Sequence, residues 1–241
     1  MTMKKDRMRI LVIRPEPDAA RTAEKLRASG HEVTVDSLLS VEAVPFDVPR
    51  QTYAALAVTS ANALRVAGEA PALAKLKALP LYALGMQTAN AARLAGFSNI
   101  EAAGGDANAL AVLLSRRLPA GARALYLAGE DRAKDLAALT AAAKIAIETV
   151  VVYRAKAAAR LQPATAAKLA AGEFGAVLHF SPRSAEIFLR LVREAGCEAA
   201  LKTSRHLCIS AAVAAALAPA GIAAEVAARP DEAALLALLD I

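Results

Sequence analysis

The sequence predicts an α/β protein made of two doubly wound parallel-sheet lobes. Short runs of β-branched residues and leucine alternate with alanine-rich helical stretches through nearly all of the 241 residues, which is typical of parallel βα units. Hydrophobic residues make up 56% of the chain but aromatic residues only 4%, so small aliphatic side chains must form the cores between helices and sheets. The length suits two domains, each with its own core.

The expected strands are short apolar runs bounded by turn residues or by helical stretches. In chain order they cover 9–13, 32–36, 54–58, 80–84, 98–102, 123–128, 145–153, 175–180, 205–209 and 223–227. Helices are expected in the intervals. The helix at 18–30 begins at Asp18 and ends at Gly30, and the helix at 106–121 begins at Asp106 and is stopped by Pro119, in agreement with capping preferences.

A strand, a hydroxyl residue and a helix follow one another twice, in AVTSANALRV (57–66) and HFSPRSAEIF (179–188). A longer alignment joins 82–114 to 207–239 and indicates an internal βαβα repeat. Alanine-rich helices can match by composition alone, so the interpretation rests on shared turn residues. The alignment pairs Gly96 with Gly221, Asp106 with Asp231 and Leu113 with Leu238.

The order of the strands predicts a discontinuous first domain. The strands after residue 175 are too few for a doubly wound sheet, and the first βαβ piece lacks a sheet, so joining the two completes a flavodoxin-like lobe. Domain A then comprises 1–37 and 157–241, and domain B comprises 38–156. The crossings at 36–50 and 148–161 are extended in character, and we expect them to pair as a two-stranded hinge beside a cleft between the lobes.

Composition and motifs exclude several classes of function. The net charge of +6 favours anionic partners. The sequence lacks the basic stripe with interleaved aromatic residues that is typical of nucleic-acid binding. The start lacks a signal-peptide pattern, and the uncharged stretch 207–224 reads as strand, helix, turn and strand rather than a membrane span. Cys197 and Cys208 suit structural thiols in a reducing cytoplasm. Metal-ligand and nucleotide-binding spacings are absent.

Polar residues at the strand ends are the candidate ligand-binding groups. They are Arg14, Thr59, Ser60, Thr88, Gly129, Ser181, Arg183 and Ser210. We expect each to lie where a helix begins, so that backbone N–H groups and the helix dipole favour an anion by about 0.3–1 kcal/mol. For any one of these hydroxyls, helix N-capping without a ligand is the better explanation, whereas the set, repeated in both lobes, favours binding of a carboxylate or phosphate.

Tyr153 is the candidate for chemistry. It follows a run of valines where the chain leaves domain B for the hinge, which would bring its hydroxyl near the cleft. The alternative is a half-buried strand aromatic with a hydrated hydroxyl. His179 precedes Phe180 and Ser181 in a strand, and we expect it to be packed rather than catalytic.

Short matches in order along most of the chain resemble the uroporphyrinogen-III synthase family. They are RP at 14–15, TSANA at 59–63, LGMQTA at 84–89, LAGEDRAKDL at 127–136, VVYRA at 151–155, FSPRSAEIF at 180–188 and PDEAALLALL at 230–239. The pair VVYR and FSPRSA is the most distinctive. The resemblance implies a discontinuous two-lobed enzyme that works without a cofactor.

The resemblance also implies a substrate and a reaction. Hydroxymethylbilane, a linear tetrapyrrole with carboxylates on every pyrrole, would lose water and close its ring with inversion of the last pyrrole through a spiro intermediate. Tyr153 would assist loss of the hydroxyl. Thr88 matches a family threonine that faces the cleft, and Ser60 and Ser181 match family hydroxyls at the two repeated junctions. Where many family members have Gly-Pro-Thr, residues 210–212 of this chain are SAA. The role of the family threonine is therefore not assigned to Ala212, and its hydroxyl contact is either lost or moved to Ser210.

The alternative function is a two-lobed binding or sensing protein for a small polyanion, which would share the hinge and the strand-end hydroxyls. For the enzyme we expect a cytoplasmic monomer with a small-molecule substrate, no metal, no nucleic acid and no membrane partner. A transient contact with the preceding pathway enzyme is left open.

Overall fold

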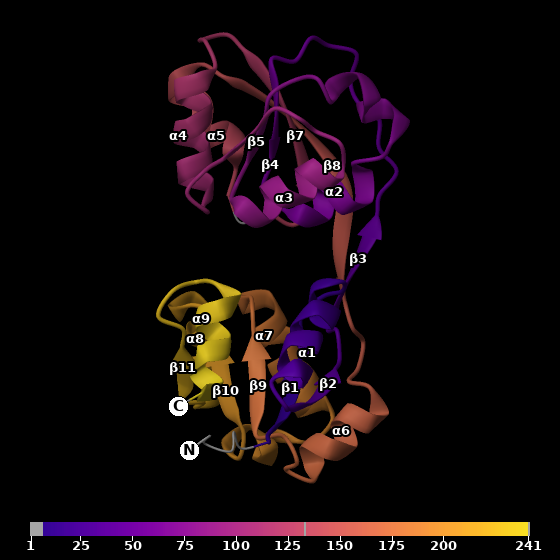
Figure 1. The fold of residues 1–241 in the computed structure, drawn as a ribbon, viewed down its shortest axis with the longest axis vertical. Coiled ribbons are helices and arrows are strands. Elements are labelled where there is room, and N and C mark those ends of the chain that lie inside the picture. The colour runs from indigo at the N-terminus through magenta and orange to yellow at the C-terminus, as the bar shows by residue number, and fades with distance from the viewer. Residues whose placement is uncertain (1–6, 133, 241) are drawn as a thin grey trace. The chain divides into compact units, whose positions relative to one another are not determined.

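The computed structural model describes residues 7–132 and 134–240. The chain forms two compact units (Figure 1). Unit 1 contains the chain up to Ser40 and from Lys156 onward, and unit 2 contains Val41–Ala155. Both are α/β structures whose strands run parallel except for β3, so the predicted fold class is confirmed.

Unit 1 is built on a five-stranded parallel sheet in the order β11-β10-β9-β1-β2. Its strands are β1 (Arg9–Val12), β2 (Glu32–Val35), β9 (Ala176–His179), β10 (Arg205–Cys208) and β11 (Ala224–Val226). The register pairs Ile10 with Ala176, so the N-terminal strand lies directly beside a strand from the later part of the chain. Figure 1 shows the indigo β1 next to the orange β9. The first βαβ piece therefore completes the C-terminal sheet, as predicted.

Helices cover both faces of this sheet. Leu207 packs with residues of α1 (Asp18–Ala28) and α9 (Glu232–Ala237), whereas its neighbour Cys208 packs with residues of α7 (Pro182–Glu194) and α8 (Ala211–Leu217). Successive strand residues point to opposite faces, so the two pairs of helices lie on opposite sides. α6 (Pro163–Ala170) leads into β9.

Unit 2 holds a six-stranded sheet in the order β3-β8-β7-β4-β5-β6. Its strands are β3 (Leu39–Ala43), β4 (Ala55–Val58), β5 (Leu81–Ala83), β6 (Ile100–Ala102), β7 (Arg123–Gly129) and β8 (Ala146–Ala157). On β7, Leu125 and Leu127 pack with α2 (Ala61–Ala67) and α3 (Met86–Leu94). Tyr126, between them, packs with α4 (Ala107–Arg117) and α5 (Leu136–Thr140) on the other face.

β3 and β8 form the two-stranded ribbon that the crossings predicted. The Val44 N–H donates to the Val152 carbonyl, and the Ala158 N–H donates to the Leu38 carbonyl, which defines an antiparallel pair. β8 extends to Ala157, beyond the expected end at 153. Short 3₁₀ segments complete the connections: η1 (Pro71–Leu76), η2 (Ala141–Ala143), η3 (Glu198–Lys202), η4 (Ala218–Ala220) and η5 (Leu238–Asp240).

The two sheets share one strand order. β11-β10-β9-β1-β2 in unit 1 corresponds to β6-β5-β4-β7-β8 in unit 2, so β1 takes the place that β7 has in unit 2. The repeated turn residues have matching roles. Gly96 and Gly221 both have positive φ, +84° and +68°, and Asp106 and Asp231 both cap a helix by accepting from the N–H three residues later.

Two histidines are stacked in the core of unit 1. His179 Nε2 lies 3.0 Å from His206 Nδ1, and His206 Nε2 lies 3.1 Å from the Leu201 carbonyl oxygen. A carbonyl can only accept, so His206 carries its proton on Nε2 and accepts from His179. Burial, and then His206, lower the pKa of His179 well below its usual value; burial lowers the pKa of His206 to about 4. Both rings are therefore neutral at pH 7.

Acidification should destabilise unit 1 through this pair. Between pH 6.5 and pH 4 the unfolded chain binds a proton on His206 that the folded chain rejects, so stability falls as the pH falls. We expect a loss of about 2 kcal/mol from His206 between pH 7.5 and pH 5, measured by urea unfolding. His206→Gln should weaken the dependence. An unfolding free energy that is the same at both pH values would contradict this account.

Candidate functional site

Each sheet has a point where neighbouring strands lead to helices on opposite faces. In unit 2, β4 leads to α2 and the adjacent β7 leads to α5; in unit 1, β9 leads to α7 and the adjacent β1 leads to α1. Such switch points open a crevice at the carboxyl ends of the strands, where doubly wound sheets bind ligands. We call these two places switch point 1, in unit 1, and switch point 2, in unit 2.

Most of the candidate residues gather at the switch points. Thr59, Ser60 and Gly129 follow or end the two strands at switch point 2, and Arg14, Ser181 and Arg183 follow the two strands at switch point 1. Thr88 and Ser210 come after the next strand of each sheet, β5 and β10. These residues therefore lie at or after the carboxyl ends of strands, as the sequence predicts.

A second tyrosine, which sequence reasoning missed, belongs to switch point 2. The hydroxyl of Tyr126 lies 2.7 Å from Thr59 Oγ1, within hydrogen-bonding distance. Burial raises the pKa of Tyr126; the bond to Thr59 partly lowers it, and nearby Tyr153 raises it further. Tyr126 is 4% exposed, so its phenol stays protonated at neutral pH. Its position in the middle of an apolar strand gave no sequence signal that it would meet Thr59.

Tyr153 reaches switch point 2 through an irregularity in β8. The register pairs Ala128 with Val151 but Gly129 with Tyr153, which leaves Val152 as an extra residue in β8. Such a bulge re-aims the side chains that follow it. Val152 and Tyr153 are consecutive, yet both pack against the core cluster on the α2 and α3 face. The Tyr153 ring is half-buried and its tip lies beside Gly129.

Gly129 does not begin a helix, which corrects the sequence expectation. β7 continues through Gly129 because this residue still pairs with Tyr153, and α5 begins only at Leu136, capped by Asp135. Arg132 donates from Nη1 to the Gly129 carbonyl at 3.0 Å, and the Glu130 N–H donates to the Tyr153 carbonyl at 2.9 Å. The backbone at this strand end is therefore held from both sides.

The serines differ in how their hydroxyls are used. Ser60 Oγ accepts from the Asn62 N–H at 3.2 Å. Ser181 Oγ accepts from the Ser184 N–H at 3.1 Å and donates to Ser184 Oγ at 2.8 Å. Ser210 occupies the N-cap position of α8 but makes no side-chain cap bond. Thr88, in the first turn of α3, is 5% exposed.

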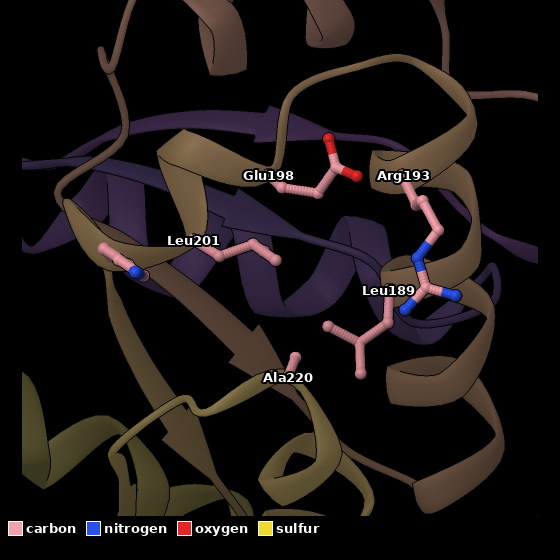
Figure 2. Close-up of a pocket in the computed structure, with 6 residues that line it drawn as sticks. Leu189, Arg193, Glu198, Leu201 and Ala220 are labelled. Carbon is pink, nitrogen blue, oxygen red and sulfur yellow. The ribbon is translucent and has the colours of Figure 1, made fainter.

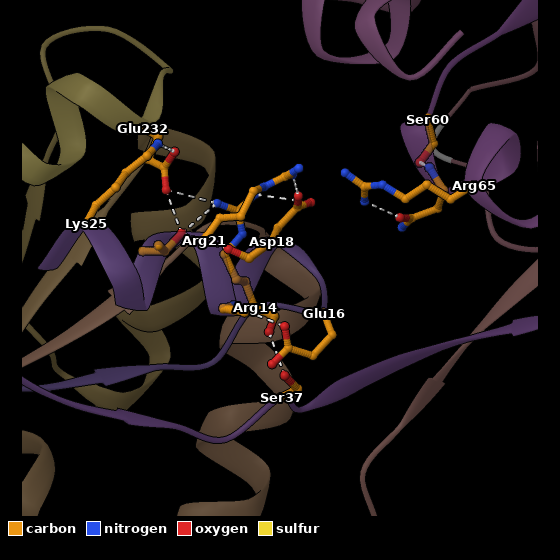
Figure 3. Close-up of polar contacts among 12 residues, drawn as sticks. Arg14, Glu16, Asp18, Arg21, Lys25, Ser37, Ser60, Arg65 and Glu232 are labelled. Carbon is orange, nitrogen blue, oxygen red and sulfur yellow. Dashed lines mark hydrogen bonds and ion pairs between the residues drawn. The ribbon is translucent and has the colours of Figure 1, made fainter. Parts of the chain in front are cut away.

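Arg14 lies in a network of the chain's own carboxylates (Figure 3). Its guanidinium is 3.5 Å from both Asp18 Oδ2 and Glu232 Oε1, and it stacks 4.1 Å above the ring of Phe180. Burial raises the pKa of Glu232, but bonds from Lys25 and Thr22 outweigh it and leave the pKa below its usual value. Arg14 therefore ties α1 to the start of α9.

A separate cavity of about 230 Å³ lies in unit 1 (Figure 2). It is lined by Leu189, Arg193, Glu198, Leu201, Lys202 and Ala220. η3 and η4 precede β10 and β11 in the chain, so the cavity lies at the amino-terminal edge of the sheet. It is not part of either switch point.

The part of the chain that the structure describes shows neither a metal-ligand group nor a membrane-spanning helix. It contains no group of three or more histidine, cysteine, aspartate or glutamate side chains that could hold a metal ion. None of the described helices has the length and apolar character needed to cross a membrane. The stretch 207–224 forms the end of β10, then α8, η4 and the start of β11, as the sequence predicts.

Comparisons with known proteins agree with this architecture. The family model described as "Uroporphyrinogen-III synthase HemD" matches residues 20–237. Uroporphyrinogen-III synthetase from Helicobacter pylori is similar in structure, with a TM-score of 0.68 and 21% identity over 97% of this chain and 98% of that one. A mutant synthase from Thermus thermophilus gives a TM-score of 0.56 and 18% identity, covering 97% of both chains. At these identities the structures show the fold alone. No curated protein matches.

The unequal use of the serine hydroxyls predicts unequal effects on stability. Ser181→Ala removes the cap of the longest helix of unit 1 and should lower the free energy of unfolding by about 1 kcal/mol. Ser210→Ala removes a hydroxyl that caps nothing, so its effect should stay within about 0.5 kcal/mol. Chemical unfolding of both variants measures the difference. Equal losses would mean that Ser210 also caps its helix.

Proposed function

This chain belongs to the uroporphyrinogen-III synthase family, a family of cyclising lyases of haem biosynthesis, and we propose how its residues carry out that reaction. The substrate is hydroxymethylbilane, which closes to the ring with inversion of its last pyrrole. One observation carries the assignment of residues: the tip of the half-buried Tyr153 ring lies beside Gly129 at switch point 2, close enough to raise the pKa of Tyr126, whose hydroxyl pairs with Thr59.

Tyr153 acts as the acid for the leaving hydroxyl. Its O–H gives a proton to the terminal hydroxyl of the bilane. The C–O bond then breaks, water departs, and the bilane becomes an azafulvenium cation. The substituted carbon of the last pyrrole attacks this cation to form the spiro intermediate. The spiro intermediate then fragments, and the ring closes at the other carbon of the last pyrrole. This closure releases one proton, which returns to the Tyr153 oxygen and restores the phenol. A positioned acid contributes about 10²- to 10⁴-fold in rate.

Positioning contributes more than the acid. Holding the reacting ends of a flexible chain together can supply about 7–11 kcal/mol of the barrier. The bilane is a polyanion, and the groups proposed to bind its carboxylates are the strand-end residues. Ser210, with a hydroxyl that its helix does not use, and Arg183, in the first turn of α7, are the strongest of these. Ser60 and Ser181 contribute mainly by fixing the helices that follow them.

The enzyme is proposed to work as a monomer in the cytoplasm without a cofactor. Among the described residues, the large apolar side chains with high exposure lie on four elements: Met86 and Leu94 on α3, Val112 on α4, Leu139 on α5 and Val226 on β11. Exposed apolar residues spread over several elements are common on monomeric proteins. Both cysteines are free and buried, which suits a reducing compartment. Any contact with the preceding pathway enzyme would be transient.

The test is turnover of freshly generated hydroxymethylbilane, with the porphyrin isomers separated after oxidation. We expect the inverted isomer from the native enzyme. Tyr153→Phe should lower kcat by about 10²-fold or more while the product stays mainly inverted, because the substrate is still held in position. Tyr53→Phe is the matched control: Tyr53 is buried in unit 2 and its hydroxyl donates to the Pro49 carbonyl at 3.2 Å.

Two outcomes would contradict these assignments. If the native protein yields only the uninverted isomer, it does not catalyse the reaction and the alternative of a polyanion-binding protein gains support. If Tyr153→Phe gives only the uninverted isomer at the spontaneous rate, acid catalysis outweighs positioning.

A further inference from the structure

The geometry points to Gly129 as a positioning residue for the reaction. Because Gly129 has no side chain, the tip of the Tyr153 ring occupies the space that a Cβ would fill, and this fixes the Tyr153 hydroxyl at the end of β7. The inference rests on the proposed role of Tyr153 as the acid. It assigns Gly129 a steric task in place of the ligand-binding role expected from the sequence.

The distances leave no room for a side chain at position 129. An ideal Cβ built there would lie 2.6 Å from Tyr153 Cζ, 2.8 Å from its hydroxyl oxygen and 3.0 Å from Cε2. Carbon atoms in contact normally stay about 3.5–4.0 Å apart. An alanine at this position must therefore displace the ring tip by about 1 Å, and the atoms displaced first include the hydroxyl itself.

Backbone conformation does not explain this glycine. The glycines with positive φ, which favour glycine for conformational reasons, are Gly30, Gly96, Gly105, Gly121, Gly172, Gly196 and Gly221. Gly129 is not among them. Its strand conformation is one that any amino acid could adopt if space allowed, so the Tyr153 ring is the reason for its small size.

The surroundings prevent the backbone from moving to accommodate a side chain. The Gly129 carbonyl accepts from Arg132, the Tyr153 carbonyl accepts from the Glu130 N–H, and the bulge at Val152 fixes where the two strands meet. The side chain of Val152 is fully buried in the core cluster that Tyr153 also contacts. Strain from a methyl group at 129 is therefore relieved by rotation of the Tyr153 side chain, which carries its hydroxyl away from switch point 2.

A pair of double-mutant comparisons tests the inference. Gly129→Ala should lower kcat for hydroxymethylbilane about 10²-fold, the effect of a misplacement near 1 Å, and change KM much less. In the Tyr153→Phe background it should cause no further loss of kcat, because no hydroxyl remains to be misplaced. Gly175→Ala is the control: its Cβ would lie 2.5 Å from the flexible Met8 side chain in unit 1, and kcat should be unchanged.

Unfolding measurements cover the case in which Gly129→Ala is poorly stable. In the Tyr153→Ala background the ring is absent, so Gly129→Ala should cost no additional unfolding free energy, whereas it destabilises the native sequence. An equal loss of kcat in the native and the Tyr153→Phe backgrounds would overturn the inference, because Gly129 would then act independently of the hydroxyl. If Tyr153→Phe alone leaves kcat unchanged, the proposed role of Tyr153 as the acid is wrong. The unfolding comparison then shows separately whether Gly129 determines the position of the Tyr153 ring.

Discussion

The pairing of β1 with β9 is the constraint on which the rest of the structure depends. It joins Ile10 to Ala176 in a parallel ladder and gives unit 1 the strand order that unit 2 has on its own. Without it, the C-terminal strands would form an incomplete sheet and β1 would have no partner on one side. The pairing also creates switch point 1, because β1 and β9 lead to helices on opposite faces.

The two equivalent strand ends have different uses. In unit 2, β7 ends in a residue without a side chain, and the space receives an aromatic ring from the neighbouring strand. In unit 1, β1 is followed by Arg14, which the chain neutralises with Asp18 and Glu232. One scaffold thus carries two phenols at the switch point of one unit and a closed ionic network at that of the other. The shared strand order fixes the position of the switch points, and local side chains determine their chemistry.

The sequence predicts most of the fold because local signals agree with it. Apolar runs mark the strands, and Gly96, Gly221, Asp106 and Asp231 mark the repeated turns. Details that depend on distant partners could not be predicted. The extra residue at Val152 exists only relative to β7, Arg14 meets Glu232 through tertiary folding, and the contact of Tyr126 with Thr59 requires β4 and β7 to be neighbours. Gly129 was expected at a helix start because its pairing with Tyr153, which extends β7, also depends on a distant strand.

Amide hydrogen exchange with and without the bound tetrapyrrole product tests most directly whether the carboxyl-end switch points hold the substrate. The account predicts slower exchange, on product binding, in the segments that follow β1, β4, β7 and β9, around Arg14, Ser60, Gly129 and Ser181. Slowing confined to the amino-terminal edge of unit 1, around the cavity of Leu189 and Leu201, or an absence of slowing at the ends of these strands, would contradict it.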